Sequence, residues 1–269
     1  MADTKDLTIQ QGKTFSLPVR WENGDLVVRK PITAISLAFG APRLTVASHG
    51  LQAGWRTYVT RCQGMKQINA ANTPPRDGDY HPATVIDATT IELNDIDPVD
   101  ANGKEWTAYT EGGFLNWNAP VDLTGYTARM SVCDRVAKGL EKTANLWQPA
   151  TAYVAGQYIV LANGTTVMLC KTGGTSGATR PTAAGTDGTV VWAVDATFTG
   201  PKELYRLFSP ASGIVIDNTA KTITLSIPAT DTDGFTWKNG VYDLEMVSSA
   251  SAVTAILSGK VSVTKEVTT

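Results

Sequence analysis

Charged residues, cysteine and histidine are all scarce in this chain of 269 residues. Lys, Arg, Asp and Glu together make up 18% of it, and the net charge is −2. Without a basic excess the chain has little to neutralise phosphates, so a nucleic-acid partner is not expected. No apolar run approaches the roughly 18 residues that a membrane-spanning helix needs. The polar start from Met1 to Asp6 has no apolar signal core, so we expect synthesis in the cytoplasm without secretion.

The few cysteines and histidines show no pattern of a metal or disulfide site. Cys62, Cys133 and Cys170 are odd in number and far apart, and no C-x-x-C pair occurs. Neither a disulfide framework nor a zinc site is predicted, and buried free thiols are expected. His49 and His81 lack the spacing of metal ligands. His49 follows an apolar run, and we expect it to bond backbone groups of a turn.

Motifs for catalysis and ligand binding are incomplete. Gly12-Lys13-Thr14 is like the end of a P-loop, but a leucine stands where the first glycine belongs. Gly174-Thr175-Ser176-Gly177 is followed by alanine and therefore misses the nucleophile elbow. Asp95, Asp97 and Asp100 carry oxygen ligands of the kind that Ca²⁺ takes, although acidic turns are usually only solvated. We therefore predict no catalytic residue, no metal and no cofactor, and a chain that is not an enzyme.

Short apolar or alternating runs rich in threonine and valine fill the chain instead. Such runs, separated by turn residues at intervals of about 8–12 residues, are typical of sandwiches and barrels, so the predicted fold class is all-β. The expected strands are Leu7–Gln10, Phe15–Trp21, Arg43–Ala47, Thr84–Ile86, Thr90–Leu93, Tyr126–Val132, Tyr158–Leu161, Val167–Cys170, Val190–Val194, Gly213–Ile216, Thr222–Ile227, Val241–Val247 and Val253–Val263. Helical periodicity is confined to Arg135–Ala144 and to one turn at Ala229–Gly234.

Five of the Asn-Gly and Asp-Gly pairs in this chain are interpreted as turns between or beside these runs. Both residues of such a pair tolerate positive φ, so each pair is expected to close a hairpin. The pairs are Asn23-Gly24, Asn102-Gly103, Asn163-Gly164, Asp187-Gly188 and Asn239-Gly240.

Two ordered motifs carry a resemblance to a family. Asp6–Trp21 contains I-x-Q-G-x-T-F, and Asp122–Met130 reads D-L-T-G-Y-x-A-R-M. With the closing runs at 213–216, 222–227 and 240–246, these motifs resemble a structural family of phages and prophages. The arrangement is similar to the N-terminal β-sandwich of baseplate upper proteins and related tail proteins. The resemblance implies a β-sandwich core in three separated pieces that cover about half of the chain.

Two further stretches resemble small domains inserted into that core. Leu44–Leu51 and Thr84–Leu93 are similar to a small β-domain repeated in phage tail proteins, with H-G-L-x-x-G before one strand and V-x-D-x-x-T-F-x-L around another. Ile91 stands in place of the usual phenylalanine. Trp147–Tyr153 and Asp187–Trp192 resemble the ends of chitin-binding-type carbohydrate-binding modules.

The aromatic residues of the second insert have two interpretations. Exposed on a rigid β-surface, Trp147, Tyr153 and Trp192 would stack on sugar rings. Buried, the same rings would supply much of the core of a small domain. Met168 stands where such modules have tyrosine.

The expected organisation is a β-sandwich core interrupted by two small β-domains. The core takes 1–34, 119–145 and 199–269, the first insert 35–118, and the carbohydrate-binding-like module 146–198. The resemblance implies a non-enzymatic virion protein, assembled in the host cytoplasm, that forms a ring in the tail or baseplate with copies of itself and other virion proteins. Two alternatives stay open: a receptor-binding protein contacting host surface glycans through Trp147, Tyr153 and Trp192, and a head or collar decoration protein.

Overall fold

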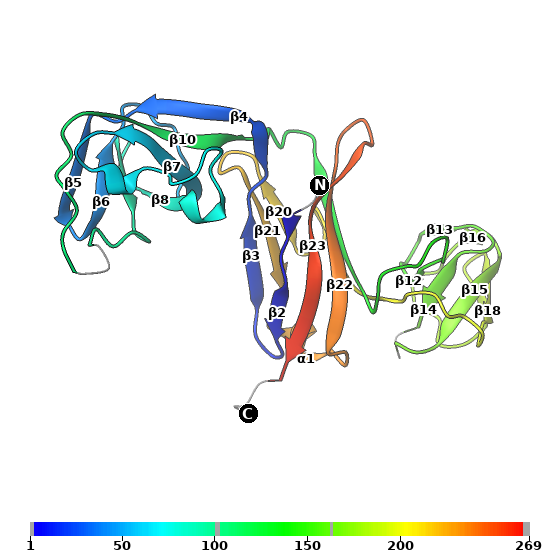
Figure 1. Ribbon diagram of the computed structural model, residues 1–269. Coiled ribbons are helices and arrows are strands. Elements are labelled where there is room, and N and C mark those ends of the chain that lie inside the picture. The colour runs from blue at the N-terminus through cyan, green and yellow to red at the C-terminus, as the bar shows by residue number, and fades with distance from the viewer. Residues whose placement is uncertain (1–2, 100–102, 162–163, 266–269) are drawn as a thin grey trace. The chain divides into compact units, whose positions relative to one another are not determined.

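β-Strands make up nearly all of the regular structure in the computed structural model, which describes residues 3–99, 103–161 and 164–265 (Figure 1). The prediction of an all-β fold is confirmed, and the described residues contain one α-helix, α1 (Ala229–Asp233). Two compact units divide the chain. The first comprises 1–19, 124–216 and 223–269, and the second comprises 20–123 and 217–222.

The first unit contains a two-layer sandwich whose strands come from three parts of the chain. One sheet has the order β1-β23-β22-β11-β19, with β2 also paired to β23, and the other has the order β20-β21-β3. These strands are β1 (Asp3–Thr4), β2 (Leu7–Gln10), β3 (Phe15–Val19), β11 (Thr127–Cys133), β19 (Glu203–Phe208), β20 (Ile214–Asp217), β21 (Thr222–Ile227), β22 (Asn239–Val247) and β23 (Val253–Thr264).

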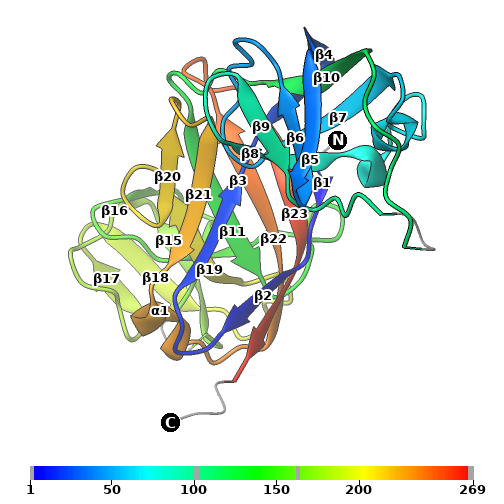
Figure 2. The ribbon, with the colours of Figure 1, turned by 90° about the vertical axis from the view of Figure 1, so that its left-hand side faces the viewer.

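The first and last strands of the sandwich lie side by side. β2 runs parallel to β23, and β3 runs antiparallel to β21. Figure 2 shows β3, β21 and β20 as one layer, with β22 and β23 in the other. The N-terminal residues therefore become part of the sheets only by pairing with strands from the other end of the chain.

A period of two along the strands sets which side chains fill the sandwich. In β22, Tyr242, Leu244 and Met246 are buried, whereas Asp243 and Glu245 point to the opposite face. Because alternate side chains of a strand face opposite sides, one apolar row per strand is enough to build the interior. That interior is made up of Leu7, Ile9, Ala128, Met130, Val132, Leu207, Ile223, Leu225, Ile227, Tyr242, Leu244, Met246, Leu257 and Val261.

A second sheet system in the first unit forms a small module. Its main sheet has the order β12-β14-β15-β18-β17, and β13 pairs with β16. The strands are β12 (Ala144–Leu146), β13 (Ala152–Tyr153), β14 (Tyr158–Val160), β15 (Val167–Thr172), β16 (Gly174–Thr175), β17 (Gly185–Asp187) and β18 (Val190–Val194). Gly188, with φ of +62°, lies in the tight turn from β17 to β18. A hairpin therefore forms at Asp187-Gly188, as predicted.

The second unit is a seven-stranded sheet that curls into a half-barrel, with the order β4-β10-β7-β8-β9-β6-β5. Its strands are β4 (Glu22–Pro31), β5 (Ala34–Phe39), β6 (Ala41–Thr45), β7 (Trp55–Cys62), β8 (His81–Val85), β9 (Thr90–Leu93) and β10 (Gly112–Pro120). Two 3-10 turns, η1 (Lys66–Ile68) and η2 (Asp77–Asp79), lie between β7 and β8. The unit is wider than the expected insert at 35–118, because β4 pairs with β10 along nearly its whole length.

The two outer strands of this sheet follow each other in the chain. Between β4 and β5, the Ile32 amide donates to the Gly113 carbonyl at 3.0 Å and the Thr33 amide donates to the Thr45 carbonyl at 2.9 Å. The backbone thus leaves one end of the sheet and reaches the other within two residues. This bend curls the sheet around its apolar face.

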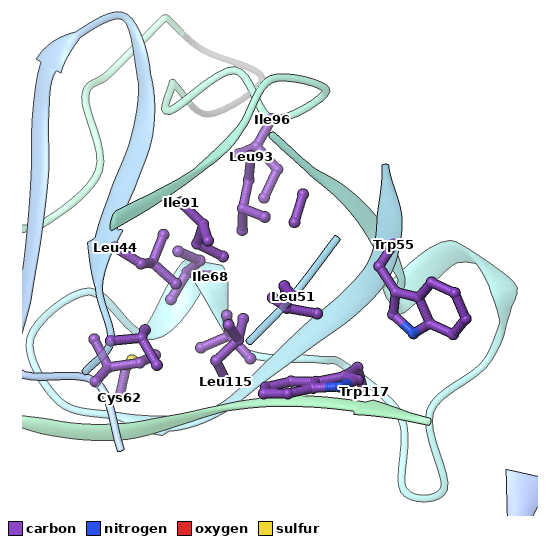
Figure 3. Close-up of a cluster of buried hydrophobic side chains, with 14 of the residues drawn as sticks. Leu44, Leu51, Trp55, Cys62, Ile68, Ile91, Leu93, Ile96, Leu115 and Trp117 are labelled. Atoms are coloured by element: carbon purple, nitrogen blue, oxygen red, sulfur yellow. The ribbon is translucent and has the colours of Figure 1, made fainter. Parts of the chain in front are cut away.

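Apolar side chains from most of the strands fill the curl. Figure 3 shows Leu44, Ile91, Leu115 and Trp117 pointing into the same interior. The buried set comprises Ile32, Leu44, Val46, Leu51, Trp55, Val59, Cys62, Met65, Ile68, Ala83, Ile91, Leu93, Ile96, Leu115 and Trp117. Such a core explains why this unit is compact in its own right.

Asn23-Gly24 does not close a hairpin, so that prediction was wrong. Val27 pairs with Asn118 while Asn23 pairs with Ala119, which leaves 24–26 as a bulge inside β4. An Asn-Gly pair permits the unusual backbone of a bulge as well as that of a turn.

Asn239-Gly240 is also wrong as a hairpin turn, since both residues lie in β22. A Cβ at Gly240 would come within 2.8 Å of a methyl group of Val132, so close packing rather than turn geometry explains this glycine. Asn102 and Asn163 lie outside the described residues.

Of the two predicted helical segments, one is confirmed. α1 begins after Pro228. Residues 135–144 instead form a turn and the beginning of β12, with Gly139 at φ of +60°. A glycine in the left-handed region interrupts a helix, which explains the difference.

Candidate functional site

The three rings expected to contact sugar lie inside the module. Trp147, Tyr153 and Trp192 are 6%, 9% and 2% exposed, and the rings of Tyr153 and Trp192 meet edge to face at 5.0 Å. They pack with Ile159, Leu161, Met168, Cys170 and Val190. Stacking on a sugar requires an exposed ring face, and none of these three rings offers one in the structure. Their positions match the core interpretation.

A buried carboxylate holds the polar edges of both indoles. Trp147 Nε1 and Trp192 Nε1 donate to Asp187 Oδ2 at 2.7 and 3.2 Å, and the Gly177 amide donates to Oδ1 at 2.8 Å. The Tyr153 hydroxyl oxygen accepts from the Gln148 amide at 2.8 Å. The hydrogen-bonding groups of the rings are therefore engaged within the module.

A second buried carboxylate lies where the module joins β19. Glu203 is 2% exposed. Its carboxylate accepts from Arg206 Nε at 2.7 Å and Nη2 at 2.5 Å, from the Ser131 hydroxyl at 2.8 Å and from the Leu146 amide at 2.8 Å. Donors from β11, β12 and β19 thus converge on one side chain, which satisfies a charge that would otherwise be costly to bury.

A cleft of about 700 Å³ opens beside Glu203, over the outward face of β11, β19 and β22. Its walls are Arg129, Ser131, Cys133, Thr143, Asn145, Gln148, Arg206, Phe208, Asp243 and Glu245. Arg129 Nε pairs with Glu245 Oε2 at 2.6 Å. Partial burial raises the pKa of Asp243, and the neighbouring charge of Glu245 raises it further. The cleft is thus polar, with fixed donors and acceptors.

The three thiols are free, as predicted, and two of them are buried. Burial raises the pKa of Cys62 to about 11. Burial also raises the pKa of Cys133 to about 11, with a smaller contribution from the carboxylate of Glu203. The Cys170 thiol donates to the Thr172 carbonyl at 3.3 Å, and burial raises its pKa too. Thiols with such pKa values carry little thiolate near neutral pH.

His49 is a buried turn residue, and its predicted role is confirmed. The Leu51 amide donates to His49 Nδ1 at 3.1 Å. Because Nδ1 accepts, Nε2 carries the proton and donates to the Asp87 carbonyl at 2.8 Å. Both ring nitrogens therefore stabilise the turn.

The acidic segment with Asp95, Asp97 and Asp100 is described only in part, because Asp100 lies outside the described residues. Asp95 Oδ2 lies 3.0 Å from His81 Nδ1. In the part of the chain that the structure describes, no three His, Cys, Asp or Glu side chains gather as metal ligands would. Within the same residues, no helix has the length and apolar character of a membrane span.

Sequence reasoning did not single out the residues that build the cleft. Asp243 and Glu245 had a usable signal, because they alternate with buried residues in β22 and so share an outward face. Glu203 and Arg206 had none. An acid followed three residues later by arginine is common in any chain, and only the pairing of β19 with β11 brings Ser131 to Glu203.

Comparison with known proteins adds no relative. No protein-family model matches the sequence, and no curated protein matches it either.

Proposed function

We propose that this chain is a structural protein of a bacteriophage virion, in the tail or baseplate, where it assembles with copies of itself and with other virion proteins. The observation that carries the proposal is the way in which folded β-modules are inserted into one sandwich. Three further features support it.

The glycines of the family-like motifs lie at turns of the sandwich. Gly12, with φ of +75°, lies between β2 and β3, and Gly125, with φ of +73°, lies in the turn that leads into β11. Only glycine adopts this conformation at little cost. The glycines of both motifs therefore lie where the backbone of the sandwich requires a positive φ. This agreement supports the resemblance to tail proteins.

Each insertion leaves and rejoins the chain through neighbouring residues. The Val121 amide donates to the Trp21 carbonyl at 3.0 Å. The Asp134 amide donates to the Lys202 carbonyl at 3.0 Å, and the Ala144 amide donates to the Pro201 carbonyl at 2.9 Å. Because both ends of each insertion lie close together, a module can be added without disturbing the strands around it. Such a chain presents several folded surfaces to its neighbours, as a building block of an assembly must.

An ordered loop presents apolar side chains to solvent. Leu140 is fully exposed and Val136 is largely exposed. The loop is held by the ion pair of Arg135 Nη1 with Glu141 Oε2 at 2.6 Å and by the Lys138 amide, which donates to the same oxygen at 2.9 Å. Interfaces between proteins bury apolar side chains at their centre, so this loop is a natural subunit contact.

The test is to locate the chain in particles of the phage that encodes it. We expect mass spectrometry to find it in purified virions and electron cryomicroscopy to place it as symmetric density in the tail or baseplate. Density on the head or collar would favour a decoration protein. Absence from purified particles, when the chain is present in the infected lysate, would refute a virion role.

A further inference from the structure

We propose that the cleft over the outward face of β11, β19 and β22 binds a short, uncharged oligosaccharide. This site differs from the three rings that the sequence singled out, because those rings are buried. It does not depend on where the chain lies in a virion.

The polar groups of the cleft are fixed before any ligand arrives. The guanidinium of Arg206 is held by Glu203, and that of Arg129 is held by Glu245. Both arginines retain further N–H groups, since a guanidinium has five donors. A site whose donors are already oriented loses less entropy on binding, which raises affinity.

The charges of the cleft argue for an uncharged ligand. The two arginines are each neutralised by a glutamate, which leaves Asp243 as the remaining charge on the walls. An anion would be repelled by Asp243. A cation would find Asp243 as the one wall carboxylate without an ion pair, and no group of three ligands gathers there among the described residues. A sugar hydroxyl both donates and accepts, so it suits a wall on which carboxylate oxygens alternate with N–H groups.

The remaining wall residues supply hydrogen-bonding groups and an apolar surface for a sugar ring. Asn145 and Gln148 carry amides that can donate and accept at once. Phe208 is half-exposed and gives the cleft an apolar patch, against which the C–H face of a sugar ring can pack. The volume of about 700 Å³ falls in the range of roughly 300–1,000 Å³ that is usual for ligand pockets.

The experiment titrates the full chain with three uncharged trisaccharides, chitotriose, maltotriose and cellotriose, followed by NMR or calorimetry. Concentrations up to about 10 mM reach the weak affinities that are common for single sugar sites. We expect at least one trisaccharide to bind. The double variant Asn145→Ala/Gln148→Ala should weaken that binding by about tenfold or more.

The matched control is Thr186→Ala, which changes an exposed residue of the same module outside the cleft. It should bind as the unchanged chain does, and thermal unfolding should show that all variants are folded. No binding of any of the three sugars would overturn the proposal, as would binding that the double variant leaves unchanged. If no sugar binds, the chain is still expected in purified virions. Failure of this proposal can therefore be told apart from failure of the proposed function.

Discussion

Asp187 shows how one side chain can decide the stability of a small module. Its carboxylate accepts from Trp147, Trp192 and Gly177, and it is itself buried. Asp187→Asn keeps the shape but places an amide NH₂ against at least one of these donors. Because hydrogen bonds to a charged group contribute about 1.5–3 kcal/mol, we expect the free energy of unfolding of the module to fall by about 2 kcal/mol.

Chemical denaturation monitored by tryptophan fluorescence measures this change. Thr186→Ala, one residue away and exposed, serves as the control and should leave the transition where it is. An Asp187→Asn variant as stable as the control would show that the two indole contacts contribute nothing net.

The cysteines provide a second prediction at the scale of single residues. With pKa values of about 11 for Cys62 and Cys133, roughly one thiol in a thousand is ionised at pH 8. We expect a disulfide reagent to label the folded chain slowly at that pH and the unfolded chain quickly. Labelling of Cys133 should accelerate as the pH approaches 11. Fast labelling of the folded chain at pH 8 would contradict these pKa values.

At the scale of elements, short turns depend on carboxylates that accept hydrogen bonds from backbone amides. Asp79 Oδ2 accepts from the Arg76 amide at 2.7 Å and Asp79 Oδ1 from the Ala71 amide at 2.8 Å, and these bonds lower its pKa. Hydrogen bonds from Thr89 lower the pKa of Asp87 in the same way, and Thr197 lowers that of Asp195.

A pH dependence follows from these three turns. A carboxyl whose pKa is lower in the folded state stabilises the fold above its unfolded pKa of about 3.9. That contribution is lost as the pH falls through the folded pKa. We therefore expect the free energy of unfolding to fall below about pH 4. Asp79→Asn should be less stable at pH 7 and should show a shallower fall between neutral and acid pH. Denaturation curves at several pH values measure both, and an unchanged slope would contradict the role of Asp79.

Sequence predicts most precisely the strands that have one polar and one apolar face. Thr222–Ile227 alternates cleanly and matches β21 residue for residue. β10 was missed, because it is buried on both faces through Leu115–Ala119 and therefore lacks alternation. β4 was missed for the opposite reason, since exposed residues and a bulge remove its apolar row. Alternation identifies half-buried strands, and a short apolar run can identify a buried strand such as Val167–Cys170. Strands with neither pattern, such as β4 and β10, are decided by packing.

At the scale of the whole molecule, the loop with Leu140 predicts an effect on assembly without an effect on folding. Leu140→Asp replaces a fully exposed side chain, so thermal unfolding should not change. If the loop is a subunit contact, a charge there should lower incorporation into particles by about tenfold, since an apolar contact residue contributes 1–2 kcal/mol or so.

The control for this substitution is Val154→Asp, which also changes an exposed apolar residue but lies in the module. Complementing a phage that lacks the gene with each variant, and counting the chain in purified particles, measures incorporation. Equal incorporation of Leu140→Asp and the unchanged chain would remove the loop from the subunit contact.

The candidate site is less predictable than the fold, for a reason visible in two sets of residues. Trp147 and Trp192 attract notice in the sequence because tryptophan is rare, yet the same large ring is what a small core requires. Arg206, Asp243 and Asn145 are ordinary surface residues that become one wall only when three strands and a module meet. A group of residues of this kind is brought together by strand pairing, so no local sequence pattern predicts it.

The pairing of β2 with β23 has a consequence for biosynthesis. A ribosome delivers Leu7–Gln10 before most of the sandwich, but the strand that they pair with, Val253–Thr264, is translated after all other strands of the sandwich. The half-barrel has all of its seven strands within 22–120 and can fold while the rest is still being made. The sandwich must wait, because β3 stays unpaired until β21 is made and β2 stays unpaired until β23 emerges. A product terminated before Val253 would therefore lack a complete sandwich.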